Sequence, residues 1–181
     1  MGVLSKILRI SLALLLSMAT ALEAQEQEKL VSFTIKNAGI NVKGTFHKYQ
    51  VSTRFDPNAV DKAYMEVSID VNSIDTGIGG RDKHLKKFKY FDAENHPNIE
   101  FQSTEITKTA TGYLVKGNLM IKETTKAIEI PFTVGEHGNE YILEGNFTLN
   151  RRDYGVGKKH LIMGNEVKVK LYHVVRKPLN E

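Results

Sequence analysis

The sequence predicts an all-β protein in which eight antiparallel strands form a single barrel, with one short helical segment around residues 80–91. The first observation behind this prediction is a hydrophobic period of two residues, which recurs in segment after segment. The second is the shortness of the linkers between the later segments. The third is length, because about 160 residues after an N-terminal leader suit one ordinary domain.

Eight segments alternate apolar and polar residues, as half-buried strands do. The clearest is 63–71, where apolar residues occupy the odd positions and polar residues most of the even ones. Within the long second segment, Gly44 suggests a bulge or a sharp bend. In order along the chain, the predicted strands are 31–36, 41–55, 63–71, 98–107, 113–121, 126–134, 141–149 and 167–173.

The linkers at 109–112, 122–125 and 135–139 are too short for the crossovers that parallel strands need, so neighbouring strands are predicted to be antiparallel. A sheet of eight long strands has two exposed edges unless it closes, and closure into a barrel removes them. An eight-stranded barrel has room for its own side chains or for one small ligand.

The segment 72–97 breaks the strand pattern. Within it Arg81, Leu85 and Phe88 are spaced i, i+4 and i+7, so a helix would place them on one face. We expect such a helix to cap one end of the barrel.

Residues 1–21 have the order of a secretory signal. Lys6 and Arg9 precede an apolar run at 10–16, and Ala19-Thr20-Ala21 supplies a small-residue cleavage site. We expect cleavage after Ala21, which leaves a domain of residues 22–181 with no membrane span. The alternative is a short membrane anchor, although the run is shorter than a stable span requires.

Composition excludes several classes of function. The formal net charge is +4, and loss of the leader leaves 23 basic against 21 acidic residues, which gives no electrostatic case for nucleic-acid binding. Without cysteine there is no disulfide, thiol nucleophile or thiolate metal site. The six histidines are scattered and no catalytic motif occurs, so we predict neither a metal site nor an enzyme.

Two polar clusters are candidates for the mouth of the barrel. Residues 81–85 combine cations with a carboxylate, but Arg81 and Asp82 can equally form a structural ion pair or a helix start. Residues 150–155 contain paired arginines that suit an anionic head group such as a diphosphate, or that simply hold a loop. The candidate mouth residues are Arg81, Asp82, His84, Leu85, Phe91 and Arg152.

Apolar residues of the strand faces are candidates for a cavity lining, although such stripes are more often ordinary core. Gly117 and Gly145 fall on the apolar parity and argue for internal space. The candidate lining residues are Phe33, Val67, Ile69, Phe101, Leu119, Phe132, Phe147 and Val169.

The order of the clusters resembles that of the YceI-like family of bacterial exported lipid-binding proteins over about residues 31–175. The chain departs from the family pattern in the charged turn at 122–126. It also departs from the pattern in the opening strand, because Asn37-Ala38-Gly39-Ile40 comes after Phe33. The fragments that carry the resemblance are Ser73-Ile74-Asp75-Thr76-Gly77, Arg81-Asp82-Lys83-His84-Leu85, Tyr90-Phe91-Asp92, His96-Pro97-Asn98-Ile99-Glu100-Phe101-Gln102-Ser103, Gly117-Asn118-Leu119 and Arg152-Asp153-Tyr154-Gly155-Val156.

The resemblance implies a lipocalin-like barrel whose internal pocket holds a polyisoprenoid, a quinone or a fatty acyl chain, without catalysis and with no cofactor other than that lipid. It also implies a periplasmic carrier for transport, storage or sequestration, with secretion beyond the periplasm and a homodimer left open. One alternative is a ligand-free interaction or stress-response module. Another is a lipid-modifying enzyme that uses His84 with Asp82 or Asp92 as acid and base.

Overall fold

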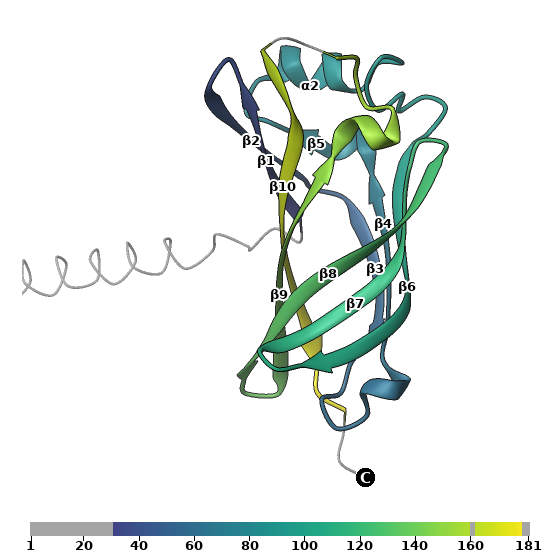
Figure 1. Ribbon diagram of the computed structural model, residues 1–181, viewed down its shortest axis with the longest axis vertical. Coiled ribbons are helices and arrows are strands. Elements are labelled where there is room, and N and C mark those ends of the chain that lie inside the picture. The colour runs from purple at the N-terminus through teal and green to yellow at the C-terminus, as the bar shows by residue number, and fades with distance from the viewer. Residues whose placement is uncertain (1–30, 160–161, 179–181) are drawn as a thin grey trace, which may run out of the picture.

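The computed structural model describes residues 31–159 and 162–178, which form one antiparallel sheet curled into a half-barrel (Figure 1). The prediction of an all-β, antiparallel, barrel-like fold is confirmed. The predicted signal segment at 1–21 lies outside the described residues. Among those that are described, no helix has the length and apolar character needed to cross a membrane.

The strands pair in the order β3-β4-β6-β7-β8-β9-β10-β1-β2-β5, so most sequence neighbours are also neighbours in the sheet. Their bounds are β1 (Val31–Asn37), β2 (Ile40–Phe46), β3 (Tyr49–Arg54), β4 (Tyr64–Asp70), β5 (Ile74–Asp75), β6 (Asn98–Thr109), β7 (Gly112–Ile121), β8 (Thr124–His137), β9 (Glu140–Asn150) and β10 (Met163–Arg176). A helix, α2 (Gly79–Leu85), and 3-10 turns at Val60–Lys62, Val71–Ser73 and Arg151–Tyr154 complete the described elements.

The sheet has ten strands rather than the predicted eight because the second segment is interrupted and the two-residue β5 is added. At the interruption the chain changes partners, since β2 pairs with β1 whereas β3 pairs with β4. His47 N donates to Ser73 O at 3.3 Å, and Lys48 O accepts from Asp70 N at 3.0 Å. These bonds to the end of β4 and to the 3-10 turn after it place the break at His47–Lys48.

Of the bulge or bend predicted at Gly44, the bulge is wrong. The register between β1 and β2 runs without a shift through the pair of Gly44 and Phe33. A Cβ added to Gly44 would lie 2.3 Å from Cζ of Phe33, so the glycine instead makes room for this cross-strand ring. Contact of an aromatic ring with a glycine on the neighbouring strand is a known way to stabilise paired strands.

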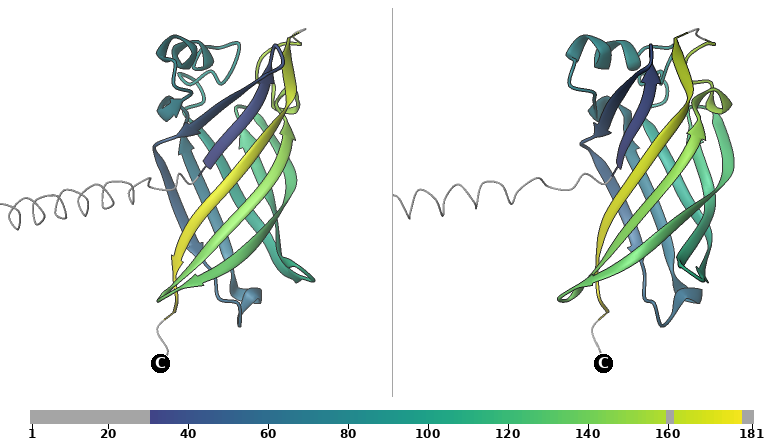
Figure 2. Two further views of the ribbon diagram at one scale, coloured as in Figure 1. Left: turned by 90° about the vertical axis from the view of Figure 1, so that its left-hand side faces the viewer. Right: turned by 60° about the vertical axis from the view of Figure 1, so that its left-hand side comes forward.

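The connections gather at two ends of the sheet (Figures 1 and 2). The first, which we call the α2 end, contains the β1–β2 and β7–β8 turns, the connection at 71–97 and residues 151–159 and 162 of the connection after β9. The second, which we call the far end, contains the β6–β7 and β8–β9 turns and the connection at 55–63.

The helix is shorter than predicted, and Phe88 does not share its face. It ends at Leu85, and the chain then reverses, with Phe91 N donating to Leu85 O at 3.0 Å and Ala93 N to Lys86 O at 2.9 Å. Phe88 lies in the reversal and is 75% exposed. Because of the reversal, Phe91 rather than Phe88 returns to the inside of the sheet.

An aromatic cluster fills the sheet at the far end. Phe55 is 2% exposed, and its ring makes edge contacts with Tyr113, Phe132 and Tyr141 at centroid distances of 5.1, 5.7 and 6.1 Å. Edge-to-face pairs of this kind add to the stabilisation from area burial. We call these four residues the aromatic plug, and they close the sheet at the end opposite α2.

Candidate ligand-binding site

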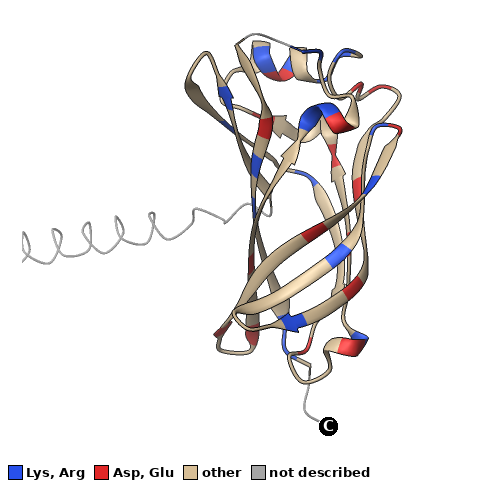
Figure 3. Cartoon of the chain, viewed as in Figure 1, with Lys and Arg blue, Asp and Glu red and all other residues tan. Residues whose placement is uncertain are grey.

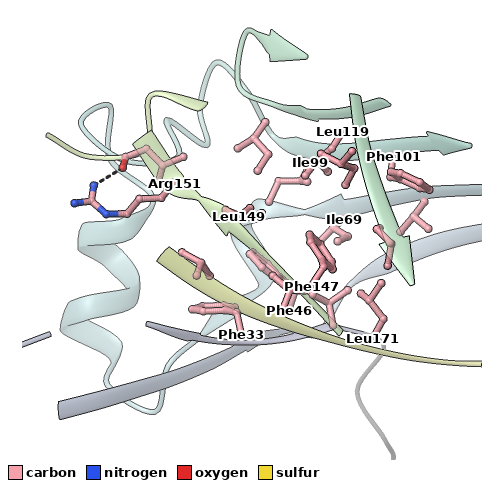
Figure 4. Close-up of a pocket in the computed structure, with 18 of the residues that line it drawn as sticks. Phe33, Phe46, Ile69, Ile99, Phe101, Leu119, Phe147, Leu149, Arg151 and Leu171 are labelled. Carbon is pink, nitrogen blue, oxygen red and sulfur yellow. Dashed lines mark hydrogen bonds between the residues drawn. The ribbon is translucent and has the colours of Figure 1, made fainter. Parts of the chain in front are cut away.

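A cavity of about 250 Å³ lies inside the curled sheet between α2 and the aromatic plug (Figure 4). Apolar cavities of this order stay dry and take up apolar molecules, because water inside them has no hydrogen-bond partners. Nearly all of the lining is aliphatic or aromatic. Its polar members are Asn37, Thr76, Arg81, Tyr90, Arg151 and His173.

All eight residues predicted from strand parity lie along this cavity. Several of them, including Phe33, Val67 and Phe147, are only half-buried although they are on the inner face of the sheet. A residue of a filled core would be fully buried, so this residual exposure marks unfilled space. The eight are Phe33, Val67, Ile69, Phe101, Leu119, Phe132, Phe147 and Val169.

The two glycines on the inner face of the sheet, Gly117 and Gly145, have different surroundings. A Cβ on Gly117 would lie 2.5 Å from Cζ of Phe101, so this glycine leaves no empty space but lets the Phe101 ring lie against the strand. Gly145 itself lines the cavity, and the nearest atom to its added Cβ would be Pro131 O at 3.3 Å. Of the two, only Gly145 therefore borders the cavity itself, whereas Gly117 accommodates the Phe101 ring.

Arg81 and Asp82 both bind Thr76 at the start of the helical segment. Arg81 donates from Nε to Thr76 Oγ1 at 2.7 Å and from Nη2 to Thr76 O at 2.6 Å. Asp82 Oδ1 accepts from the Thr76 amide at 2.9 Å and from its hydroxyl at 2.5 Å. The two side chains thus fix the entry to α2, while Arg81 also lines the cavity at this end.

The structure separates the other predicted mouth residues into two groups. Leu85 and Phe91 line the cavity, and Phe91 packs edge-on against Phe46 with centroids 6.1 Å apart. His84 is exposed outside the lining, with its ring 4.9 Å from that of Tyr90. The apolar members of the predicted mouth therefore face the cavity, whereas the histidine does not.

Of the two adjacent arginines, Arg151 rather than Arg152 reaches the cavity. Arg152 is exposed, whereas Arg151 is 4% exposed and lines the cavity. Arg151 donates to Gly164 O at 2.9 Å, to Val156 O at 2.6 Å, and to Asn165 Oδ1 at 3.2 Å. Burial, with a smaller effect from Arg152, lowers the pKa of the Arg151 guanidinium, but an arginine stays charged in proteins.

The sequence contained a signal for Arg151. Leu143, Gly145, Phe147 and Leu149 line the cavity at every second position of β9, and Arg151 continues this parity. Arg152, one residue later, falls on the outward parity. The period of the strand therefore distinguishes the two arginines, although both suit an anionic group equally by residue type.

His173 is a polar group in the lining on β10, among apolar neighbours. Burial lowers the pKa of its imidazole from the ordinary value of 6.5, because the charged form loses hydration. As the pH falls below 6.5, the unfolded chain binds this proton first, so the free energy of unfolding decreases until the folded-state pKa is passed.

We expect the free energy of unfolding of His173→Gln to decrease less on acidification than that of the wild type, because the variant lacks this imidazole. The measurement is urea unfolding of the wild type and the variant at pH 7.5 and pH 5.5. The difference between the two proteins isolates His173 from the other histidines. An equal loss of stability in both proteins on acidification would contradict the prediction.

The described residues contain no cluster of three or more His, Asp or Glu side chains suited to a metal ion. The carboxylates proposed for an enzyme are engaged locally, since Asp82 binds Thr76 and the buried Asp92 accepts from Asn95 Nδ2 at 3.0 and 3.1 Å. The site therefore consists of an apolar cavity with a few polar groups, which suits binding.

Curated relatives share a substantial part of the chain. A UPF0312 protein of Serratia proteamaculans is 31% identical over 157 residues, which cover 80% of this chain and 82% of that protein. A UPF0312 protein of Yersinia enterocolitica is 34% identical over 122 residues, 66% of this chain and 62% of the relative.

Solved structures share the fold. BcnA of Burkholderia cenocepacia has a TM-score of 0.76 and 28% identity, with 80% of this chain and 94% of BcnA covered. A polyisoprenoid-binding domain from Saccharophagus degradans, at 14% identity, matches in fold with a TM-score of 0.63 over 82% of this chain and 93% of that one. The model of the YceI-like domain matches residues 22–175. The chain therefore belongs to the YceI-like family.

Proposed function

We propose that this protein is a non-enzymatic carrier that holds one long apolar molecule inside the curled sheet. The observation that carries the proposal is the cavity itself, which is lined by aliphatic and aromatic side chains and ends at the aromatic plug. A cavity of this kind excludes water and suits a hydrocarbon chain. Its role is transport, storage or sequestration of that molecule.

A polyisoprenoid, a quinone or a fatty acyl chain is the ligand class that fits this lining. Burial of apolar surface contributes roughly 25 cal/mol per Å², so a chain that buries a few hundred Å² gains several kcal/mol before the cost of immobilisation. The shared fold of the Saccharophagus degradans polyisoprenoid-binding domain supports the isoprenoid among these classes.

A polar end of the ligand is expected to lie beside Arg81 and Arg151, the two cations of the lining. Guanidinium groups suit carbonyl, carboxylate or phosphate oxygens. An anionic head group there makes binding weaker at high salt, whereas a neutral head group makes it nearly independent of salt.

The predicted leader at 1–21 supports export to the periplasm as the place of action. The mature N-terminus of the protein recovered from a periplasmic extract tests this directly. A first residue of Leu22 is the expected result, and retention of Met1 in the membrane fraction would contradict it.

The carrier proposal is tested by expressing the chain from Leu22 in bacteria and purifying it without detergent. Native mass spectrometry and mass spectrometry of an organic extract are expected to show one stoichiometric isoprenoid, quinone or fatty-acid species. A ligand-free protein that also fails to take up added lipids of these classes would refute the carrier and favour the interaction module.

A further inference from the structure

The most exposed large hydrophobic side chains gather at the α2 end. Ile40, Ile78, Phe88 and Ile162, which we call the apolar rim, are 68%, 56%, 75% and 55% exposed. The other large hydrophobics with high exposure among the described residues, Tyr49, Tyr64 and Val174, reach only 37–42%. Exposed apolar groups concentrated on one surface mark an interaction site more often than scattered ones do.

The segments that carry the rim are tied to one another and to neighbouring connections. Ala38 N, in the turn before Ile40, donates to Ile162 O at 2.7 Å. Lys122, in the β7–β8 turn, lies 5.7 Å from the centroid of the Phe88 ring. Gly157 N donates to Lys89 O at 2.9 Å and so joins the connection after β9 to the turn that carries Phe88.

Basic residues outnumber acidic ones at the α2 end, where the rim residues are found (Figure 3). The described connections of the α2 end, 71–97, 122–123 and 151–159, hold ten Lys and Arg against six Asp and Glu, a net charge of +4. Those of the far end, 55–63, 110–111, 138–139 and 177–178, hold two of each sign. Lys83, Lys87 and Lys89 are exposed close to Phe88 in the sequence.

Apolar side chains surrounded by lysines match the two layers of an anionic membrane surface. Lysine ammonium groups are attracted to lipid phosphates, while the apolar tips enter the boundary between head groups and acyl chains. We propose that the apolar rim docks this protein on anionic lipid bilayers.

Docking in this orientation has a consequence for the cavity. Arg81, Thr76 and Met163, which line the cavity at its α2 end, would face the bilayer, and the aromatic plug would face away. An apolar molecule can then move between bilayer and cavity without passing through water. This is favourable because passage through water would expose its whole apolar surface. The docking itself does not depend on which molecule the cavity holds.

The test is a vesicle flotation assay. It uses the chain that begins at Leu22, which lacks the apolar leader and retains the domain that matches the family. Two vesicle compositions are compared, phosphatidylglycerol mixed with phosphatidylethanolamine, and phosphatidylcholine alone. The test variant is Ile78→Ser with Phe88→Ser. The matched control is Tyr64→Ser with Val174→Ser, which removes two exposed apolar side chains near the far end.

We expect the wild type to float with the anionic vesicles and not with phosphatidylcholine, and to dissociate as salt is raised. The rim variant should lose at least tenfold in its partition coefficient, while the control stays within twofold. Thermal unfolding followed by circular dichroism verifies that both variants are folded. Absence of wild-type binding, equal binding to both vesicle types, or equal losses in both variants would overturn the proposal, and the first would point to a protein partner.

Discussion

Phe55→Ala is expected to lower the free energy of unfolding by about 3–5 kcal/mol, the range found when a buried Phe is truncated. Phe55 is 2% exposed, and its ring contacts Tyr113, Phe132 and Tyr141 at once. Its removal leaves a hole bounded by three rings that are held on separate strands and cannot all move inward. Urea unfolding followed by circular dichroism measures the change.

Phe88→Ala is the matched control, because it truncates the same residue type where the ring is 75% exposed. A surface truncation of this kind changes stability by about 0.5 kcal/mol or less. Similar losses in the two variants would show that packing in the aromatic plug does not stabilise the fold.

Leu171→Trp is expected to reduce uptake of an apolar ligand at least tenfold by filling the cavity. Leu171 is half-buried, lines the cavity, and lies opposite Gly145 on β9, where the lining is least bulky. An added indole ring occupies space that the ligand needs, and a strand with room beside it accepts the larger side chain at small cost. Binding of a fluorescent fatty acid to delipidated protein measures the effect.

Lys170→Trp is the control for this change, since it places the same ring one residue away on the exposed outer face of β10. Its affinity is expected to equal that of the wild type. If Leu171→Trp, folded as judged by its thermal unfolding, binds as tightly as the control, the ligand does not occupy this cavity.

The strand pattern of the sequence determined the fold class and the inner face of the sheet. Side chains on a strand alternate between two faces, so the alternate positions that are apolar in each strand are those that meet inside the sheet. The eight lining residues, from Phe33 on β1 to Val169 on β10, follow directly from this local rule. The same rule predicts that Arg151 rather than Arg152 faces the cavity, because the alternation of β9 continues past the end of the strand.

Features that depend on contacts between distant residues were decided only by the tertiary structure. Gly44 and Gly117 look like points of bending or open space in the sequence, yet each accommodates a phenylalanine ring from a neighbouring strand. The break between β2 and β3 follows from hydrogen bonds to residues 70–73, which no local pattern encodes.

The end of α2 was decided in the same way. The spacing of Arg81, Leu85 and Phe88 is helical, but the bond from Phe91 N to Leu85 O turns the chain back toward the cavity. Phe88 is left on the surface and Phe91 takes the inner position. Periodicity describes which residues share a face of one element, whereas the place where an element stops depends on the neighbours that its backbone and side chains meet.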